Sequence, residues 1–169
     1  QLAAMSIAGV RFDAHEEKNV TAEDNYLYKK GMIAENTAAM PDWRCLGCPT
    51  VCEVCADVCP NRANVAVHVP GKCQAQIVHV DGMCNECGNC AVFCPHTGRP
   101  YKAKFTLFWS EEDFADSTNE GFLLTGEDSV KLRLDGQEQT VKTDELDRIS
   151  ADAAGVIRAV IKEYRYLIQ

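Results

Sequence analysis

The chain has 169 residues, carries a formal net charge of -8 and is 46% apolar. This apolar content is typical of globular proteins and excludes global disorder, and the length suits one ordinary domain or a small module with appendages. The acidic charge argues against proteins that bind nucleic acid or anionic membranes nonspecifically.

Residues 1–43 are polar-rich and are expected to form a helical extension. Thr21 has the position of an N-cap with Asp24 three residues later, Gly31 could divide the segment into two helices, and Pro41 would end it. The opening QLAAMSIAGV lacks the basic region and cleavage site of a secretory signal, and its apolar run is too short to span a bilayer. Because the chain also starts without Met, we expect a fragment of a longer polypeptide.

All ten cysteines lie between Cys45 and Cys94. A disulfide scaffold would usually spread its bridges over the whole of a small secreted chain. This concentration instead predicts a cytoplasmic protein whose reduced thiols bind metal.

Two cysteine runs flank a predicted β-hairpin. The first, RCLGCPTVCEVCADVCP, covers residues 44–60, and the second, CNECGNCAVFCP, covers residues 84–95. Between them, the β-rich runs Asn64–Val69 and Gln76–Val80 flank a Pro-Gly turn. Both cysteine runs end in C-x-x-C-x-x-x-C-P, so the order of run, hairpin and run forms an internal repeat.

The second run matches the bacterial ferredoxin pattern C-x2-C-x2-C-x3-C-P. Three closely spaced thiolates wrap the backbone around one cluster, and the fourth points to another cluster. Gly88 and Asn89 are small enough to let the backbone approach the cluster, and Pro95 removes a donor and redirects the chain.

The first run departs from this pattern at one position. The residue expected to be its first ligand is Pro49, and Cys48 lies one residue further out. Cys45 competes for the same role, but we favour Cys48 because one inserted residue is easier to loop out than four.

Crossed ligation, as in two-cluster ferredoxins, then predicts two [4Fe–4S] sites. No residue is predicted to be catalytic. The ligands of cluster one are expected to be Cys48, Cys52, Cys55 and Cys94. The ligands of cluster two are expected to be Cys84, Cys87, Cys90 and Cys59. Cys45 and Cys73 are left over, and Cys73 is expected to be a free thiol.

The alternative is a structural zinc site at Cys45, Cys48, Cys52 and Cys55, in an interaction module without redox activity. Zinc ribbons usually separate their knuckles by a longer stretch, and the repeated Cys-Pro pair has no role in them. The histidines His68, His79 and His96 are expected to be exposed or hydrogen-bonded rather than ligands, because eight cysteines suffice.

Residues 101–169 contain no cysteine and are expected to form an appendage of strand, hairpin and helix. KFTLFW indicates a strand, and VKLRLDGQEQTV alternates around Asp135-Gly136, a strong hairpin signal. DELDRISADAAGVIRAVIKEYRYL has helical periodicity. Its expected core positions are Leu146, Ile149, Ala153, Val156, Ile157, Val160, Ile161 and Tyr164.

The sequence contains no G-x-G-x-x-G, phosphate loop, H-E-x-x-H or nucleophile elbow. No nicotinamide, flavin or substrate site is therefore predicted. The chain could relay single electrons, and two-electron chemistry would lie elsewhere.

RCLGCPTVCEVCADVCPNRANVAV, HVDGMCNECGNCAVFCP, GRPYKAKFTLF and DFADSTNEGFLL resemble the C-terminal iron–sulfur part of the family named for a selenate reductase flavoprotein subunit. That family is related to the glutamate synthase small chain and to dihydropyrimidine dehydrogenase. The resemblance covers roughly Arg44 to Leu124. It implies FAD and NAD(P)H on an upstream or partner domain, a molybdenum hydroxylase-type partner, and a selenate or purine/pyrimidine-type substrate.

The expected fold is therefore α+β. A helical extension (1–43) precedes a two-cluster ferredoxin-like domain (44–100), and a strand, hairpin and helix appendage (101–169) follows it.

Overall fold

The computed structural model describes residues 53–72, 75–94, 99–126 and 128–169. The helical extension expected over residues 1–43 lies outside the described residues. The same holds for Cys45, Cys48, Cys52, Cys73 and His96.

The described chain combines strands with several short helices and one helix of 13 residues. In chain order these are α3 (Val54–Asp57), β1 (Asn64–Val67), β2 (Gln76–Val80), the 3-10 helix η2 (Asp81–Met83), α4 (Asn89–Val92), α5 (Pro100–Ala103), β3 (Phe105–Phe108), α6 (Glu111–Asp116), β4 (Gly121–Leu124), β5 (Ser129–Leu134), β6 (Gln137–Lys142), η3 (Thr143–Arg148), α7 (Ala151–Glu163) and η4 (Arg165–Leu167). The fold is thus mixed α and β.

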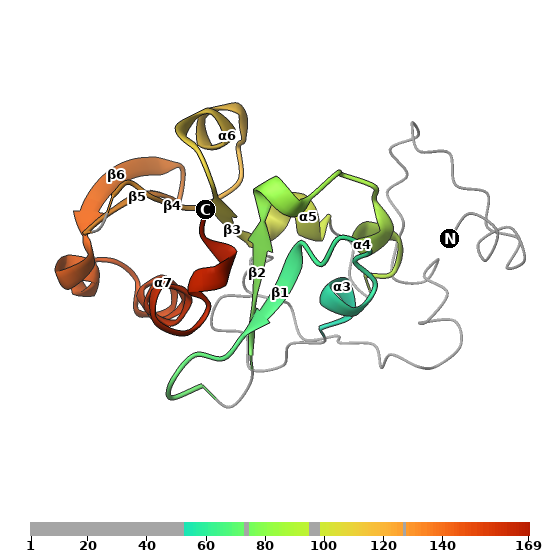
Figure 1. The fold of residues 1–169 in the computed structure, drawn as a ribbon, viewed down its shortest axis with the longest axis horizontal. Helices are drawn as coiled ribbons and strands as arrows, with labels where there is room; N and C mark the ends of the chain where they lie inside the picture. The colour runs from blue at the N-terminus through green and yellow to red at the C-terminus, as the bar shows by residue number, and fades with distance from the viewer. Residues whose placement is uncertain (1–52, 73–74, 95–98, 127) are drawn as a thin grey trace, which may run out of the picture.

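The six strands form one sheet in the order β1-β2-β3-β4-β5-β6 (Figure 1). β2, β3 and β4 run parallel to one another, whereas β1–β2, β4–β5 and β5–β6 are antiparallel pairs. Hydrogen bonding therefore continues from β2 to β3 across residue 100, the boundary expected between the cysteine domain and the appendage. The expected division into domains stays a prediction.

Both predicted hairpins are present. β1 pairs with β2 from Asn64↔His79 to Val67↔Gln76, so the first strand ends two residues earlier than expected. In the second hairpin, Asp135 and Gly136 have φ of 51° and 73°. Positive φ at both central residues matches the twist of a two-residue hairpin, which explains why Asp-Gly occupies this turn.

α7 covers one face of the sheet and builds the main core. Because side chains alternate along a strand, Val78 and Leu107 face α7 while their neighbours face the other way. Figure 1 shows α7 on one side of β1 and β2, and α3 and α4 on the other. Fully buried members of this core include Val67, Val78, Val80, Phe105, Leu107, Phe122, Val130, Leu132, Val156, Ile157 and Val160.

The C-terminal helix begins later than the periodicity indicates. Ser150 is its N-cap, with Oγ accepting a hydrogen bond from the backbone N–H of Ala153 at 3.2 Å. This cap satisfies a donor that the first helical turn leaves open, so the α-helix starts there. Leu146 is buried in η3 instead, and Ile149 lies between the two helices, so the prediction of one continuous helix from Leu146 is wrong.

The opposite face of the sheet carries two smaller apolar clusters. Ile77 on β2 packs with Cys55 and Cys90 of the cysteine segments. Phe108 on β3 packs with Phe114 of α6, whose rings meet edge to face with centroids 5.1 Å apart. Sequence periodicity predicted neither α6 nor β4. None of the helices in the described part of the chain has the length and apolar character of a membrane span.

Candidate functional site

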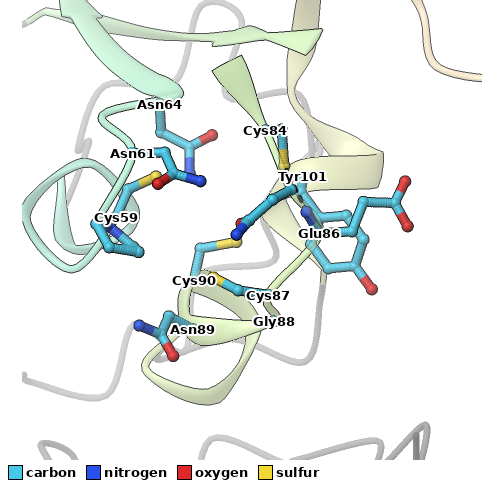
Figure 2. A pocket seen from close by; sticks show the side chains of 12 residues that line it. Cys59, Asn61, Asn64, Cys84, Glu86, Cys87, Gly88, Asn89, Cys90 and Tyr101 are labelled. Carbon is cyan, nitrogen blue, oxygen red and sulfur yellow. Dashed lines mark hydrogen bonds between the residues drawn. The ribbon is translucent and has the colours of Figure 1, made fainter. Parts of the chain in front are cut away.

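Four cysteines from two separate segments line one pocket beside β1. Figure 2 shows Cys59 on one side of the pocket and Cys84, Cys87 and Cys90 on the other. The space between the lining atoms is about 280 Å³, including a part open to solvent. Pro60, Asn61, Asn64, Asn85, Glu86, Gly88, Asn89 and Tyr101 complete the lining. These four cysteines are the set that the spacing assigns to cluster two.

The internal repeat of the sequence is also a repeat of the backbone. Glu53 and Gly88 both have left-handed φ, 53° and 79°, and each directly precedes a four-residue helix, α3 or α4. Cys55 and Cys90 occupy the same place within these helices. The left-handed turn costs a residue with a Cβ about 1–2 kcal/mol and costs glycine little, which accounts for Gly88 in the second run.

Backbone amides donate hydrogen bonds to two of the pocket sulfurs. The N–H of Ala63 donates to Sγ of Cys59 at 3.2 Å, and the N–H of Glu86 donates to Sγ of Cys84 at 3.3 Å. Hydrogen bonds of this kind stabilise negative charge on sulfur. The Glu86 amide accordingly lowers the pKa of the Cys84 thiol.

Burial opposes the ionisation of Cys90 and Cys84. It raises the pKa of Cys90 to about 11, although hydrogen bonds from the Tyr101 backbone and the Asn64 side chain lower it. Burial also raises the pKa of Cys84. The Glu86 amide lowers this pKa, and the negative charges of Cys59 and Cys87 raise it further. Four thiolates in this space repel one another, so a cationic group between them would release their protons and stabilise them.

Asn64 joins the hairpin to both cysteine segments. Its Nδ2 donates to the carbonyl oxygen of Cys55 at 3.0 Å, and its Oδ1 lies 3.0 Å from Nδ1 of His79. Because Nδ2 is the donor, Oδ1 is the acceptor, and the proton of the neutral imidazole is on Nδ1. Burial and the charge of Lys102 lower the pKa of His79 to about 4, against a smaller opposing effect of Glu86.

The remaining predicted sites have different surroundings. His79 is buried and hydrogen-bonded, whereas His68 follows β1 and is exposed. Cys55 and Cys94 are buried but do not line this pocket. Their expected partners Cys48 and Cys52 lie outside the described residues, so the ligand set of cluster one stays a prediction.

Within the part of the chain that the structure describes, no three His, Cys, Asp or Glu side chains form a group that could hold a metal ion. A single zinc ion needs thiolate sulfurs about 2.3 Å from the metal. A four-iron cluster is a larger body, and the thiolates at its corners stand farther apart. Four cysteines spread around one pocket are the donor set that the larger group requires.

Asn64 and Tyr101 were not among the site residues predicted from the sequence. Asn64 is part of a β-rich run, and Tyr101 follows the second cysteine run by several residues. No spacing rule connects an asparagine or a backbone amide to a sulfur, so only the fold brings them to Cys90.

Comparison with known proteins gives one group of relatives. Over 133 residues the chain is 44% identical to "Putative oxidoreductase YgfK" of Escherichia coli strain K12, and equally to the protein of that name from strain O157:H7. The match covers 74% of this chain and 13% of each relative. No family model matches the chain. No solved structure matches it either. The chain is thus similar to a limited part of a much longer protein named as an oxidoreductase.

Proposed function

We propose that this chain is the electron-transfer segment of a larger oxidoreductase and holds two [4Fe–4S] clusters. The observation that carries the proposal is the pocket lined by Cys59, Cys84, Cys87 and Cys90. Spacing in the sequence selects the same four cysteines as one ligand set, including Cys59 from the other run. The similarity to proteins named as oxidoreductases supports a redox role in general.

The residues around the pocket suit such a cofactor. Cys59, Cys84, Cys87 and Cys90 would supply the four thiolates, and the amides of Ala63 and Glu86 donate to two of their sulfurs. When bound, a four-iron cluster supplies one-electron chemistry. The chain's own contribution is to orient the thiolates, to stabilise their charge with N–H donors, and to exclude water around the buried Cys90.

Cluster one would be held by Cys48, Cys52, Cys55 and Cys94. Support comes from the repeated backbone, since Cys55 follows the left-handed Glu53 as Cys90 follows the left-handed Gly88. Electrons would enter the segment at one cluster and leave at the other. We place the protein in the cytoplasm, where thiols stay reduced and available to iron.

The relatives are much longer than this chain. The chain spans 13% of their length, so most of a protein of that kind lies outside it. We propose that FAD and NAD(P)H bind on an upstream or partner domain, with a molybdenum hydroxylase-type subunit as a further partner. The substrate would be selenate or a purine/pyrimidine-type heterocycle, as the family resemblance implies.

The deciding experiment measures iron, acid-labile sulfide and zinc per chain in anaerobically purified protein, with visible spectra before and after dithionite. About eight irons and eight sulfides, with a colour that dithionite bleaches, is the expected result. About four irons would mean that only one site holds a cluster. A colourless protein with stoichiometric zinc would overturn the redox proposal in favour of a structural zinc module.

A further inference from the structure

Asn64 is the first residue of β1 and a buried polar residue of the pocket. It is 4% exposed, it lies five residues after Cys59, and it lines the pocket together with all four cysteines. Figure 2 shows it on the Cys59 side, above Cys87 and Cys90. A buried amide at this place needs partners for both its donor and its acceptor.

Each polar atom of the Asn64 amide has a partner. Nδ2 donates one hydrogen to the carbonyl oxygen of Cys55, and the side chain lines the pocket together with Cys90, whose pKa it lowers as a hydrogen-bond donor. Oδ1 accepts from Nδ1 of His79. One side chain thereby connects a cysteine of each run to the hairpin between them.

His79 fixes which way this amide points. If the amide turned over, Oδ1 would face the carbonyl oxygen of Cys55 and the sulfur of Cys90, both of which are acceptors. The NH2 group would face the N–H of His79, which is a donor. His79 is 1% exposed and lies directly opposite Asn64 in the β1–β2 register, so it cannot move away to relieve this mismatch.

Tyr101 supplies a second hydrogen-bond donor for Cys90. Tyr101 lines the same pocket, and its backbone amide likewise lowers the pKa of Cys90, while the carbonyl oxygen of Tyr101 accepts a hydrogen bond from Nδ2 of Asn119 at 2.9 Å. Cys90 is 6% exposed, the least exposed of the four pocket cysteines. The two donors near Cys90 are therefore each held by a buried side chain. His79 holds Asn64, and Asn119 holds Tyr101.

We propose that Asn64 is a positioning residue that raises the reduction potential of the cluster at Cys59, Cys84, Cys87 and Cys90, and that His79 holds its amide in the donating orientation. The inference rests on the proposed function. Reduction adds negative charge to a cluster and its sulfurs, so an N–H donor stabilises the reduced form more than the oxidised form. Removing the donor should make reduction harder.

The test is a potentiometric titration of Asn64→Leu, followed by the spectrum of the reduced clusters. Leucine keeps the approximate size of the side chain and removes both the donor and the acceptor. The matched control is Asn61→Leu, the same chemical change three residues earlier on the same pocket wall. In Asn64→Leu, we expect the equilibrium constant for reduction of one of the two clusters to be about three- to tenfold smaller than in the wild type. A tenfold change corresponds to about 59 mV for a one-electron couple. Asn61→Leu replaces an exposed amide of the pocket lining, so it should shift that potential less than Asn64→Leu does.

His79→Leu keeps the Asn64 donor but removes the group that orients it, so it should shift the same potential in the same direction by a smaller amount. If Asn64→Leu fails to retain iron, His79→Leu decides the question. Unchanged potentials in His79→Leu and in any iron-containing Asn64→Leu, or an equal shift in Asn61→Leu, would overturn the inference.

Iron and sulfide analysis of the unmutated protein separates the two proposals. A wild-type chain without iron would sink the proposed function, whereas iron-replete variants with unchanged potentials would sink only the role of Asn64.

Discussion

Nδ1 of His79 lies 3.0 Å from Oδ1 of Asn64, in a site where burial lowers the pKa of the imidazole from 6.5 to about 4. The folded protein therefore keeps His79 neutral at pH values where the unfolded chain protonates it. Between pH 6.5 and 4 the unfolded state binds more protons, so the stability of the fold decreases as the pH falls through this window. Above pH 6.5 the contribution is complete.

We expect His79 to make the free energy of unfolding decrease by about 1.4 kcal/mol per pH unit in this window, on the order of 3 kcal/mol in total. Thermal unfolding of the wild type and of His79→Leu between pH 4 and 7.5 checks this. The advantage of the wild type over the variant should shrink as the pH falls. A difference between the two that stays constant with pH would contradict the assignment of a buried neutral histidine.

Cys59 is the residue that links the two cysteine runs in the proposed site. Cys59→Ala should lower the iron content from about eight to about four per chain, because crossed ligation makes Cys59 the fourth ligand of cluster two. Iron and sulfide analysis after anaerobic purification measures this. Cys45→Ala is the matched control and should keep about eight irons, since Cys48 is the favoured ligand of the first run. Full iron content in Cys59→Ala would rule out the crossed assignment.

Arg133 holds the loop after α6 against the sheet. Its guanidinium donates to the carbonyl oxygens of Phe114 at 2.8 Å and Ser117 at 2.6 Å, lies 4.2 Å from the Phe114 ring centroid, and pairs with Glu138. Because the side chain is only 12% exposed, Arg133→Lys should destabilise the fold by about 3 kcal/mol, since one ammonium cannot replace the planar fork.

Urea unfolding measures this loss, and Glu138→Gln is the comparison. Glu138 is half-exposed, so removing its charge should cost less than about 1 kcal/mol. Equal losses in the two variants would mean that the ion pair, and not the bonds to backbone carbonyls, is the main contribution of Arg133.

Gly121 occupies a place in β4 where a side chain does not fit. A Cβ there would lie 2.0 Å from the carbonyl oxygen of Thr106 on the neighbouring strand. Since backbone cannot give way without breaking the sheet, we expect Gly121→Ala to cost about 3 kcal/mol, the upper end of the usual range for overpacking.

Gly136→Ala provides the contrast for this prediction. Gly136 has φ +73° and nothing near its missing Cβ, so alanine there should cost only about 1 kcal/mol of conformational strain. Thermal unfolding should therefore rank Gly121→Ala as clearly less stable than Gly136→Ala, and the reverse order would contradict the close approach of β3 and β4.

Several elements were predictable because their signals are local. Asp135-Gly136 specifies a two-residue turn whatever surrounds it, and the alternation on either side of it defines β5 and β6. The runs beginning at Asn64 and Gln76 likewise predicted the first hairpin. The start of α7 was missed because helical periodicity continues through Leu146 and Ile149, whereas the Ser150 cap determines where the helix begins.

Some residues of the pocket could be predicted from the sequence, and others could not. Spacing of the cysteines alone selected Cys59, Cys84, Cys87 and Cys90 as one set, because in the bacterial ferredoxin pattern three ligands lie two residues apart and the fourth comes from the other run. The roles of Asn64 and Tyr101 could not be found this way. Their contacts with Cys90 depend on the hairpin and on α5 lying against α4, which are contacts between residues distant in sequence.

The sequence by itself determined the two hairpins and predicted that Cys59 belongs with Cys84, Cys87 and Cys90, since turn conformation and ligand spacing depend on neighbouring residues. Only the tertiary structure decided that β2, β3 and β4 run parallel in one sheet, with α7 on one face and the cysteine segments on the other. Parallel pairing requires long crossovers, and their closure depends on burying apolar surface from the whole chain. The same packing places Asn64 in the pocket with Cys90 and His79 within hydrogen-bond distance of Asn64.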